Sequence, residues 1–409
     1  MKLLKVDTPD AARKKLIKHI SEKRLKKEKI SLEEALGRVL AEDIVSAENI
    51  PSFNRSTVDG YAVNSSDTGC ASDGIPVFLN VVEEVQMGKA SGSTIRTGSC
   101  AYVPTGGMLP PGADAVVMIE YTESFDENSI AIYRSAAVGS NVAMKGEDIS
   151  AGETVMQKGR VLEPKDMGVL AALGKDEVEV FAKWTVSVIS TGDEVAGIKD
   201  ILHEGQVRDI NSYGISSLAV KNGMQIESVQ LIKDDEKLLK QIVEEKMHTS
   251  DMIVISGGSS KGKKDVTAKV IDEAAAPGVF THGIAAKPGK PTILGYDTAS
   301  ETLLFGLPGH PAAAMIIFDV ICLKAYKRLL GIKESFPIEA YMETNAAAAP
   351  GRTTYLSVKI TETSEGYRAV PITGKSGMIT TLSSADGYVV IGTDKEGLRA
   401  NEKVKVHLF

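Results

Sequence analysis

The stretch from Trp184 to Leu330 constrains the fold most, because it alternates apolar runs of strand length with segments of helical periodicity. Strands are expected at Thr185–Ser190, Ile226–Ile232, Met252–Ser256, Thr292–Leu294 and Leu303–Phe305. Helices are expected at Asn211–Asn222, Glu236–His248, Val266–Ala275 and Pro311–Leu330, the last ended by Gly331. This alternation predicts βαβ units and a mainly parallel sheet with helices on both faces. Ligands of such sheets bind outside the carboxyl ends of the strands, so the loops there form the candidate site.

The other parts of the chain are expected to be mainly β. Between residues 44 and 181, short β-branched runs such as Val77–Val82, Ala115–Ile119 and Ile130–Tyr133 are separated by turn-forming residues. After Gly331 a small C-terminal β-barrel is predicted, ending in the strands Tyr388–Ile391 and Val404–Leu408. Two helices are expected near the N-terminus, one opened by Thr8-Pro9 and one by a capping box at Ser31–Glu34.

Composition and charge disfavour several classes of protein. The formal charge of −7 argues against non-specific binding of nucleic acid. The three cysteines are far apart and the six histidines form no HxxxH or HExxH pattern, so a zinc hydrolase is not expected. The N-terminus lacks the apolar core of a signal peptide, and the longest apolar stretch, Ala312–Leu323, is too short to span a bilayer, so we expect a cytoplasmic protein away from membranes. The basic run Arg13–Lys29 is either a solvated helix face or a docking site.

A glycine-rich loop, Ser256–Asp265, follows one predicted strand and precedes a helix. Its sequence, SGGSSKGKKD, is neither a Walker A loop nor a GxGxxG motif. Glycines at such a place let backbone N–H groups face an anion, and the helix N-terminus adds positive potential. The loop is therefore a candidate phosphate cradle; the alternative is a plain strand–helix turn with Asp265 capping the helix.

Carboxylates follow the ends of three predicted strands. Asp193 and Glu194 lie on a glycine turn, Asp234-Asp235 follow the next strand, and Asp265 follows the third. Carboxylate oxygens are suitable ligands for a hard cation such as Mg²⁺, and the three positions can converge on one ion. The alternative for Asp234-Asp235 is a helix cap.

Basic residues lie in a second group of loops. Lys287 and Lys290 belong to the rigid turn KPGKP, where prolines reduce the entropy lost on ordering. The turn Leu307–Pro311 joins a strand to a helix N-terminus and is another candidate anion site, with His310 as a cap or packing residue. Arg352 and the loop 374–377 could add a guanidinium and a hydroxyl to an oxyanion pocket.

Eight motifs in the chain resemble those of the molybdopterin molybdenumtransferases, the MoeA family that includes the E domain of gephyrin. They are STVDGYAV, IRTG, PPGADAVVMIE, GEDI, STGDE, SGGSSKGKKD, KPGKP and GLPGHP, in the family's order. The resemblance covers nearly the whole chain. It implies a homodimer of elongated four-domain subunits: a linker domain at 1–45 and 140–182, a mixed β domain with the DGYA loop at 46–139, an α/β domain at 183–330 and a C-terminal β-barrel at 331–409. The α/β domain resembles the molybdopterin adenylyltransferases.

The chemistry that this resemblance implies is the insertion of molybdate into adenylylated molybdopterin, with Mg²⁺-assisted release of AMP. The active site is expected where the α/β domain meets the partner subunit's β domain and barrel. The implied catalytic residues are Asp59, Asp234, Asp265 and Lys287. The implied substrate-binding residues are Thr97, Glu194, Gly257, Gly258, Ser259, Lys290, Pro308, Arg352 and Ser376. The implied metal ligands are Glu194, Asp234 and Asp265.

Two departures from the family pattern bear on the anion site. Many members carry a further lysine where this chain has Gly283, and many read LPGNP where this chain has His310. A lysine at 283 is expected to tighten molybdate binding, provided that the backbone there does not need a positive φ. Use of tungstate, the preceding adenylylation step and a non-catalytic scaffold are the alternatives. The adenylyltransferase and recipient molybdoenzymes are candidate partners.

Overall fold

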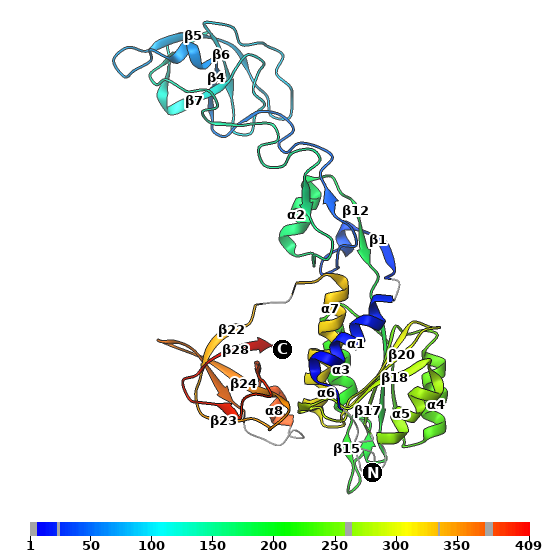
Figure 1. Cartoon of the computed structure of the whole chain (residues 1–409). Helices are drawn as coiled ribbons and strands as arrows, with labels where there is room; N and C mark the ends of the chain where they lie inside the picture. The colour runs from blue at the N-terminus through cyan, green and yellow to red at the C-terminus, as the bar shows by residue number, and fades with distance from the viewer. Residues whose placement is uncertain (1–5, 23–24, 258–263, 334–335, 373–378) are drawn as a thin grey trace. The chain divides into compact units, whose positions relative to one another are not determined.

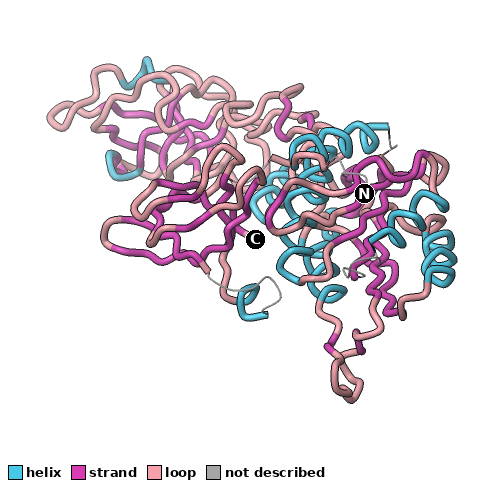
Figure 2. The backbone as a smooth tube through the Cα atoms, turned by 60° about the horizontal axis from the view of Figure 1, so that its bottom comes forward, coloured by secondary structure: helices cyan, strands magenta, loops and turns pink. Residues whose placement is uncertain are grey.

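The computed structural model describes residues 6–22, 25–257, 264–333, 336–372 and 379–409. Its backbone forms two compact units (Figures 1 and 2). Unit 1 contains residues 1–41, 159–164 and 177–409, and unit 2 contains residues 42–158 and 165–176. Residues 42–158 and 165–176 are therefore inserted into the sequence of unit 1.

The centre of unit 1 is a six-stranded sheet with the order β16-β13-β17-β21-β20-β18. Its strands are β13 (Thr185–Thr191), β16 (Gln225–Ile232), β17 (Met252–Gly257), β18 (Pro277–His282), β20 (Ile293–Asp297) and β21 (Thr302–Leu307). The first four strands in the sheet order are parallel, as the alternating pattern predicts, whereas β20 runs antiparallel to both of its neighbours, β21 and β18. Strand β18 was not predicted; it pairs with β20 without a crossover helix.

Helices cover both faces of this sheet (Figure 1). They are α1 (Pro9–Glu22), α3 (Asn211–Lys221), α4 (Glu236–Lys246), α5 (Lys264–Ala274), α6 (Pro311–Ile317) and α7 (Lys324–Leu330), with a π-helical turn, η4 (Phe318–Leu323), between α6 and α7. Alternate strand residues enter two cores, since Val188 packs with α3 and α6 while Ile189 packs with α4 and α5. Gly331, with φ 76°, ends α7 in the left-handed conformation, as predicted.

The C-terminal sheet of unit 1 closes on itself as a small barrel. Its strands are β22 (Ile338–Met342), β24 (Thr353–Thr363), β25 (Gly366–Pro371), β26 (Gly387–Ile391) and β28 (Lys403–Leu408), and β24 pairs with both β25 and β26. The short strand β19 (Ala286–Lys287) adds to β24 in parallel, so the chain after the central sheet's β18 becomes part of the barrel's edge. Beside these lie β14 (Val195–Ala196), β15 (Val207–Arg208), β23 (Ala346–Ala347), α8 (Ile379–Ser383) and β27 (Gly397–Leu398).

The helix predicted to begin at Ser31 is wrong. Lys27–Ser31 is the strand β1, which pairs antiparallel with β12 (Glu177–Phe181), and only a 3₁₀ turn, η1 (Leu32–Glu34), follows. Ser31 makes no side-chain capping bond, and Leu36, expected on a buried helix face, is 56% exposed. Pairing with a strand that lies about 150 residues later outweighs the local capping signal, which is weak evidence in itself.

Unit 2 contains a six-stranded sheet with the order β7-β4-β6-β5-β9-β8. Its strands are β4 (Gly60–Val63), β5 (Val77–Glu84), β6 (Ser99–Val103), β7 (Ala115–Met118), β8 (Thr122–Ser124) and β9 (Ser129–Ile132). The three β-branched runs of this region are thus confirmed as strands. The remaining elements are β2 (Ile44–Val45), β3 (Arg55–Ser56), η2 (Ser65–Thr68), η3 (Ile119–Tyr121), β10 (Val142–Ala143), β11 (Thr154–Met156) and α2 (Pro164–Ala172), which begins at the unit boundary. Among the described residues, no helix is long and apolar enough to cross a membrane.

Candidate functional site

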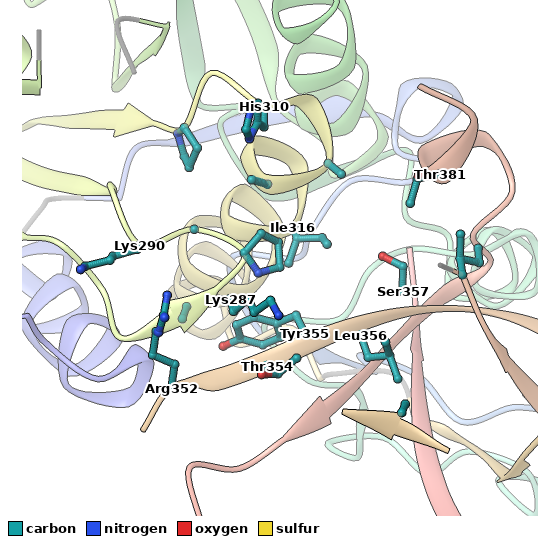
Figure 3. A pocket seen from close by; sticks show the side chains of 18 of the residues that line it. Lys287, Lys290, His310, Ile316, Arg352, Thr354, Tyr355, Leu356, Ser357 and Thr381 are labelled. Atoms are coloured by element: carbon teal, nitrogen blue, oxygen red, sulfur yellow. The ribbon is translucent and has the colours of Figure 1, made fainter. Parts of the chain in front are cut away.

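A cavity of about 960 Å³ lies in unit 1 between the loop after β19, the turn before α6 and the barrel strand β24. Lys287 and Lys290 come from the first of these segments, Pro308 from the second, and Arg352 immediately precedes the third (Figure 3). The structure therefore brings together four residues that sequence analysis had named from loops up to 65 positions apart.

Backbone pairing fixes the position of the lysine loop. Lys287 pairs with Thr354 in the β19–β24 ladder, and the Thr353 N–H donates to the Ala285 carbonyl at 2.9 Å. Gly289 has φ 110°, and a Cβ there would lie 2.3 Å from Ile317, so only glycine fits this turn. The loop is held between the barrel and α6 by its backbone, which leaves both lysine side chains exposed at the cavity.

The cavity is electropositive. Three formal cations line it, and no Asp or Glu of the described residues does so. Lys287, Lys290 and Arg352 form no ion pair with any carboxylate in the described part of the chain. Polar hydrogen-bonding groups are also present, including Thr354, Ser357 and Thr381 (Figure 3). Burial raises the pKa of Tyr355 to about 12, so this phenol stays neutral. Such a lining suits a compact oxyanion.

A second, acidic locus lies at the carboxyl ends of β13 and β16. The Asp193 N–H donates to Asp234 Oδ2 and the Asp234 N–H donates to Asp193 Oδ1, both at 3.3 Å. Lys233 Nζ donates to the Asp193 carbonyl at 3.0 Å. A cavity of about 240 Å³ adjoins Asp234 and extends to Thr191 and Thr267. Asp235 instead caps α4 by accepting bonds from the N–H groups of Lys237 and Leu238, as the capping alternative stated.

Of the three carboxylates predicted to bind a metal, only the side chains of Glu194 and Asp234 lie among the described residues. Glu194 is exposed in the loop after β13, and no group of three His, Cys, Asp or Glu side chains close enough for a metal occurs among the described residues. Gly258, Ser259, Ser376 and the Asp265 side chain lie outside that description. Convergence of Glu194, Asp234 and Asp265 on one cation therefore stays a prediction.

Gly257 ends β17 in a conformation that only glycine adopts easily. Its φ is 131°, and a Cβ would lie 2.0 Å from the carbonyl oxygen of Thr191 on the adjacent strand β13. The close approach brings the carboxyl ends of two parallel strands together at the edge where the acidic locus lies. Glycine is therefore required at 257 by the approach of two strands, whereas the predicted role of the loop's glycines in facing an anion stays a prediction.

Asn211, at the start of α3, is a site residue that sequence analysis missed. Its Nδ2 donates to Ser256 Oγ at 2.7 Å and to the Gly309 carbonyl at 2.9 Å. One buried side chain thereby links the end of β17 to the turn that lines the electropositive cavity. In the same buried layer, Asp209 accepts bonds from Ser190 and Ser212. The sequence signal was Asp209-Ile-Asn211, polar residues directly before a helix.

In unit 2, Asp59 lies between β3 and β4. The backbone N–H and the hydroxyl of Thr105 donate to Asp59 Oδ1 at 2.7 and 2.9 Å, which lowers the pKa of this carboxyl. Thr97 is exposed and precedes β6, whereas Thr105 follows that strand, so Thr97 and Asp59 lie at opposite ends of β6. Thr105 was not predicted as a site residue, although Pro104-Thr105-Gly106 is a second Thr-Gly turn.

Gly283 does not meet the condition set for a lysine at this position. It has φ 93°, and a Cβ would approach Val6 to 2.9 Å. Its N–H donates to Thr292 and its carbonyl accepts from Asp7, so this positive-φ backbone is held on both sides. The expectation that Gly283→Lys tightens anion binding is therefore withdrawn, because the substitution would strain the loop.

Three family models match consecutive parts of the chain. The MoeA N-terminal region (domain I and II) matches residues 8–174, a probable molybdopterin binding domain matches residues 187–328, and the MoeA C-terminal region (domain IV) matches residues 339–409.

Two relatives match this chain over nearly its full length. A molybdopterin molybdenumtransferase of Staphylococcus aureus (strain N315) is 32% identical over 382 residues, covering 93% of this chain and 90% of the relative. A putative molybdopterin biosynthesis protein of Methanocaldococcus jannaschii is 31% identical over 403 residues, covering 97% and 95%. The crystal structure of a molybdopterin biosynthesis MoeA protein from Pyrococcus horikoshii superposes with a TM-score of 0.84 at 36% identity, covering 99% of both chains.

Proposed function

The chain belongs to the MoeA family of molybdopterin molybdenumtransferases, and on this premise we propose that it inserts molybdate into adenylylated molybdopterin and releases AMP. Membership places it among transferases of molybdenum cofactor biosynthesis. The observation that carries the finer proposal is the cavity where Lys287, Lys290 and Arg352 gather without a carboxylate of the described residues. Molybdate is a compact tetrahedral dianion, and closely placed cations compensate for the hydration that it loses on binding.

The acidic locus complements this cavity. Adenylylated molybdopterin carries a phosphoanhydride, whose cleavage requires charge neutralisation at the phosphates. Asp193 and Asp234 offer carboxylate oxygens of the kind that bind Mg²⁺, and the adjoining Gly257 brings two strand ends together. We propose that Asp234, with Glu194 and Asp265, holds Mg²⁺ there. When bound, the ion would supply Lewis-acid stabilisation of the phosphate oxygens.

The roles of this chain's own residues follow from their positions. Lys287, Lys290 and Arg352 bind and orient the oxyanion, and the turn Pro308–His310 forms the wall of its cavity. Asn211 keeps that turn attached to the end of β17, so the two loci keep a fixed geometry within unit 1. Preorganised charges of this kind avoid reorganisation when the reaction occurs.

We also propose a homodimer in which Asp59 acts in the partner subunit's site. Asp59 is exposed, ionised and oriented by two bonds from Thr105, as a residue at an intersubunit site would be. Thr105 donates hydrogen bonds to Asp59, so it is a better candidate than Thr97 for the residue that orients Asp59. A cytoplasmic location, the use of tungstate and the candidate protein partners stay predictions.

Asp234→Asn is expected to raise the Mg²⁺ concentration that gives half-maximal AMP release by about tenfold or more, because a charged ligand becomes neutral. The measurement is AMP release across a Mg²⁺ titration, with EDTA giving the zero point. Asp235→Asn is the matched control: it removes the same charge one residue away, and asparagine still caps α4. Equal shifts in both variants, or full activity in EDTA, would contradict the magnesium site.

Inactive Asp59→Ala and inactive Asp265→Ala subunits are expected to regain activity when mixed. Random exchange makes half of the dimers heterodimers with one intact site each, so roughly a quarter of the wild-type rate is the limit. Exchange itself is followed by mass spectrometry of tagged subunits. Heterodimers that form but stay inactive would show that both residues serve the same subunit's site, and the intersubunit arrangement would be wrong.

A further inference from the structure

Two exposed phenylalanines contact each other on the sheet of unit 2. Phe78, on β5 (Figure 1), is 51% exposed, and Phe125, in the turn between β8 and β9, is 67% exposed. Their ring centroids lie 4.7 Å apart with an interplanar angle of 64°, which is an edge-to-face contact. Single exposed apolar side chains are common on protein surfaces, whereas clustered ones indicate an interaction site. Aromatic side chains are also enriched at the centres of protein interfaces.

The strand register places both rings on the same face of the sheet. Phe78 pairs with Ala131 of β9, and Ala131 pairs with Glu123 of β8, so these three residues form one row across the sheet. Phe125 lies two residues beyond Glu123 and therefore shares its face. The Phe125 N–H donates to the Ser129 carbonyl at 3.0 Å, which closes the hairpin. The backbone thus holds the aromatic pair in place before any partner binds.

The surroundings of the aromatic pair are acidic. Residues 77–84 and 119–133, which include β5, β8 and β9, contain six carboxylates and no lysine or arginine. The six are Glu83, Glu84, Glu120, Glu123, Asp126 and Glu127. None of them forms an ion pair within the described part of the chain. Glu123 accepts from the Tyr133 hydroxyl at 2.8 Å, a neutral donor that leaves its negative charge in place.

The negative charge of the chain is concentrated in unit 2. By sequence this unit contains 18 acidic and 8 basic residues, whereas unit 1 contains 36 acidic and 39 basic residues. Arg134, the first basic residue after the acidic stretch, lies over the ring of Tyr121, which packs with the core on the other sheet face. An acidic surface repels nucleic acids and anionic membranes and attracts basic protein surfaces. Charge therefore selects the class of partner.

The aromatic pair lies away from the carboxylate that we assign to the reaction. Phe78 is near the start of β5, which runs parallel to β6, so it lies at the end of the sheet where β6 begins. Asp59 is bonded to Thr105, which follows the other end of β6. An interaction at the aromatic pair is therefore independent of the proposed reaction.

We propose that this face docks a partner protein through a segment in which an apolar side chain is flanked by lysine or arginine. The apolar side chain packs against Phe78 and Phe125, and the flanking cations meet Asp126 and Glu127. A cation can also lie over a phenylalanine ring, which adds to the attraction. The apolar contact supplies most of the affinity, because exposed ion pairs alone contribute little.

Three labelled peptides test the two parts of this recognition. Lys-Lys-Phe-Lys-Lys, Lys-Lys-Gly-Lys-Lys and Glu-Glu-Phe-Glu-Glu, each carrying fluorescein, are titrated with the full-length protein while anisotropy is followed. The first is expected to bind saturably and about tenfold more tightly than the glycine peptide, since only it supplies an apolar anchor. The glutamate peptide is not expected to bind, because it carries the charge of the surface. Added salt should weaken binding of the first peptide.

Variants assign the binding to this face. Phe125→Ser, and the double variant Asp126→Asn with Glu127→Gln, are each expected to raise the dissociation constant of Lys-Lys-Phe-Lys-Lys about tenfold. Met87→Ser is the apolar control, since Met87 is 59% exposed but follows the other end of β5. Glu48→Gln is the charge control, an exposed carboxylate elsewhere in unit 2. Both controls should leave the dissociation constant unchanged, with circular dichroism verifying the fold of every variant.

Three outcomes would overturn the proposal. The first is that Lys-Lys-Phe-Lys-Lys fails to bind. The second is that the glycine peptide binds as tightly and Phe125→Ser has no effect, because binding would then be general charge attraction. The third is a change in subunit number of Phe125→Ser in sedimentation, which would show that a second copy of the chain covers this face. Phe78→Ser repeats the test if Phe125→Ser folds poorly.

Discussion

Lys290→Ala is expected to raise the molybdate concentration that gives half-maximal AMP release by about ten- to a hundredfold. Lys290 is one of three cations in a cavity where the described residues supply no carboxylate, so its loss removes a large share of the attraction for a dianion. The side chain is exposed and the loop is held by backbone pairing, so the fold should be preserved. The assay is run at constant ionic strength, because salt screens such charges.

Lys359→Ala serves as the matched control for this result, since it removes a lysine of the same unit that lies outside the cavity. Circular dichroism and Trp184 fluorescence verify that both variants are folded. If the two variants need the same molybdate concentration as the wild type, the KPGKP loop is a structural turn and the oxyanion site lies elsewhere.

Gly257→Ala is expected to lower the free energy of unfolding of unit 1 by about 3–5 kcal/mol, the range of severe core substitutions. The added Cβ would lie 2.0 Å from the Thr191 carbonyl oxygen, which belongs to the backbone of the adjacent strand and cannot turn away. Separating β13 from β17 there would also displace the acidic locus, so AMP release should fall with stability. Urea unfolding followed by Trp184 fluorescence reports on unit 1, where this residue is buried.

Gly205→Ala separates steric overlap from backbone strain. Gly205 also has a positive φ, 86°, but nothing lies within 4 Å of its would-be Cβ. It should therefore cost only the roughly 1–2 kcal/mol of the left-handed conformation. Should Gly257→Ala be no more destabilising than Gly205→Ala, the close contact between β13 and β17 would not be the reason for glycine at 257.

The parts of the fold that were predictable are those with strong local patterns. The strand β17 is a short apolar run, β13 and β16 are rich in β-branched or apolar residues, and the amphipathic helices α4 and α5 lie where the periodicity indicated. The error at Ser31 has the opposite origin. A capping box is a signal of a few residues, and pairing of β1 with β12 depends on a segment that is remote in the sequence. Strand β18 was missed because it is defined by its pairing with β20, which the local sequence pattern does not indicate.

The site residues likewise fall into those that a local pattern predicted and those that it did not. Lys287 and Lys290 were found because the KPGKP motif is recognisable in the sequence, and Arg352 was named as a possible guanidinium of an oxyanion pocket. The structure explains their grouping by the parallel pairing of β19 with β24. Asn211 and Thr105 were missed because their importance lies in what they contact: a turn about 100 residues away for Asn211, and Asp59 for Thr105. No spacing rule connects such partners.

The inserted position of unit 2 sets the order in which the protein can fold during synthesis. The chain leaves unit 1 after Ala41 and returns at Gly159, whose N–H donates to the Leu40 carbonyl at 2.9 Å. Residues 37–41 acquire their remaining partners only when β12 emerges, since the Ala41 N–H donates to Glu179. Domains generally fold as units as the ribosome releases them, so unit 2 can be nearly complete while the first segment of unit 1 is still unpaired. Helix α1 can complete its packing only late in synthesis, because its buried residues Leu16 and Ile20 belong to a core shared with α7, about 300 residues downstream.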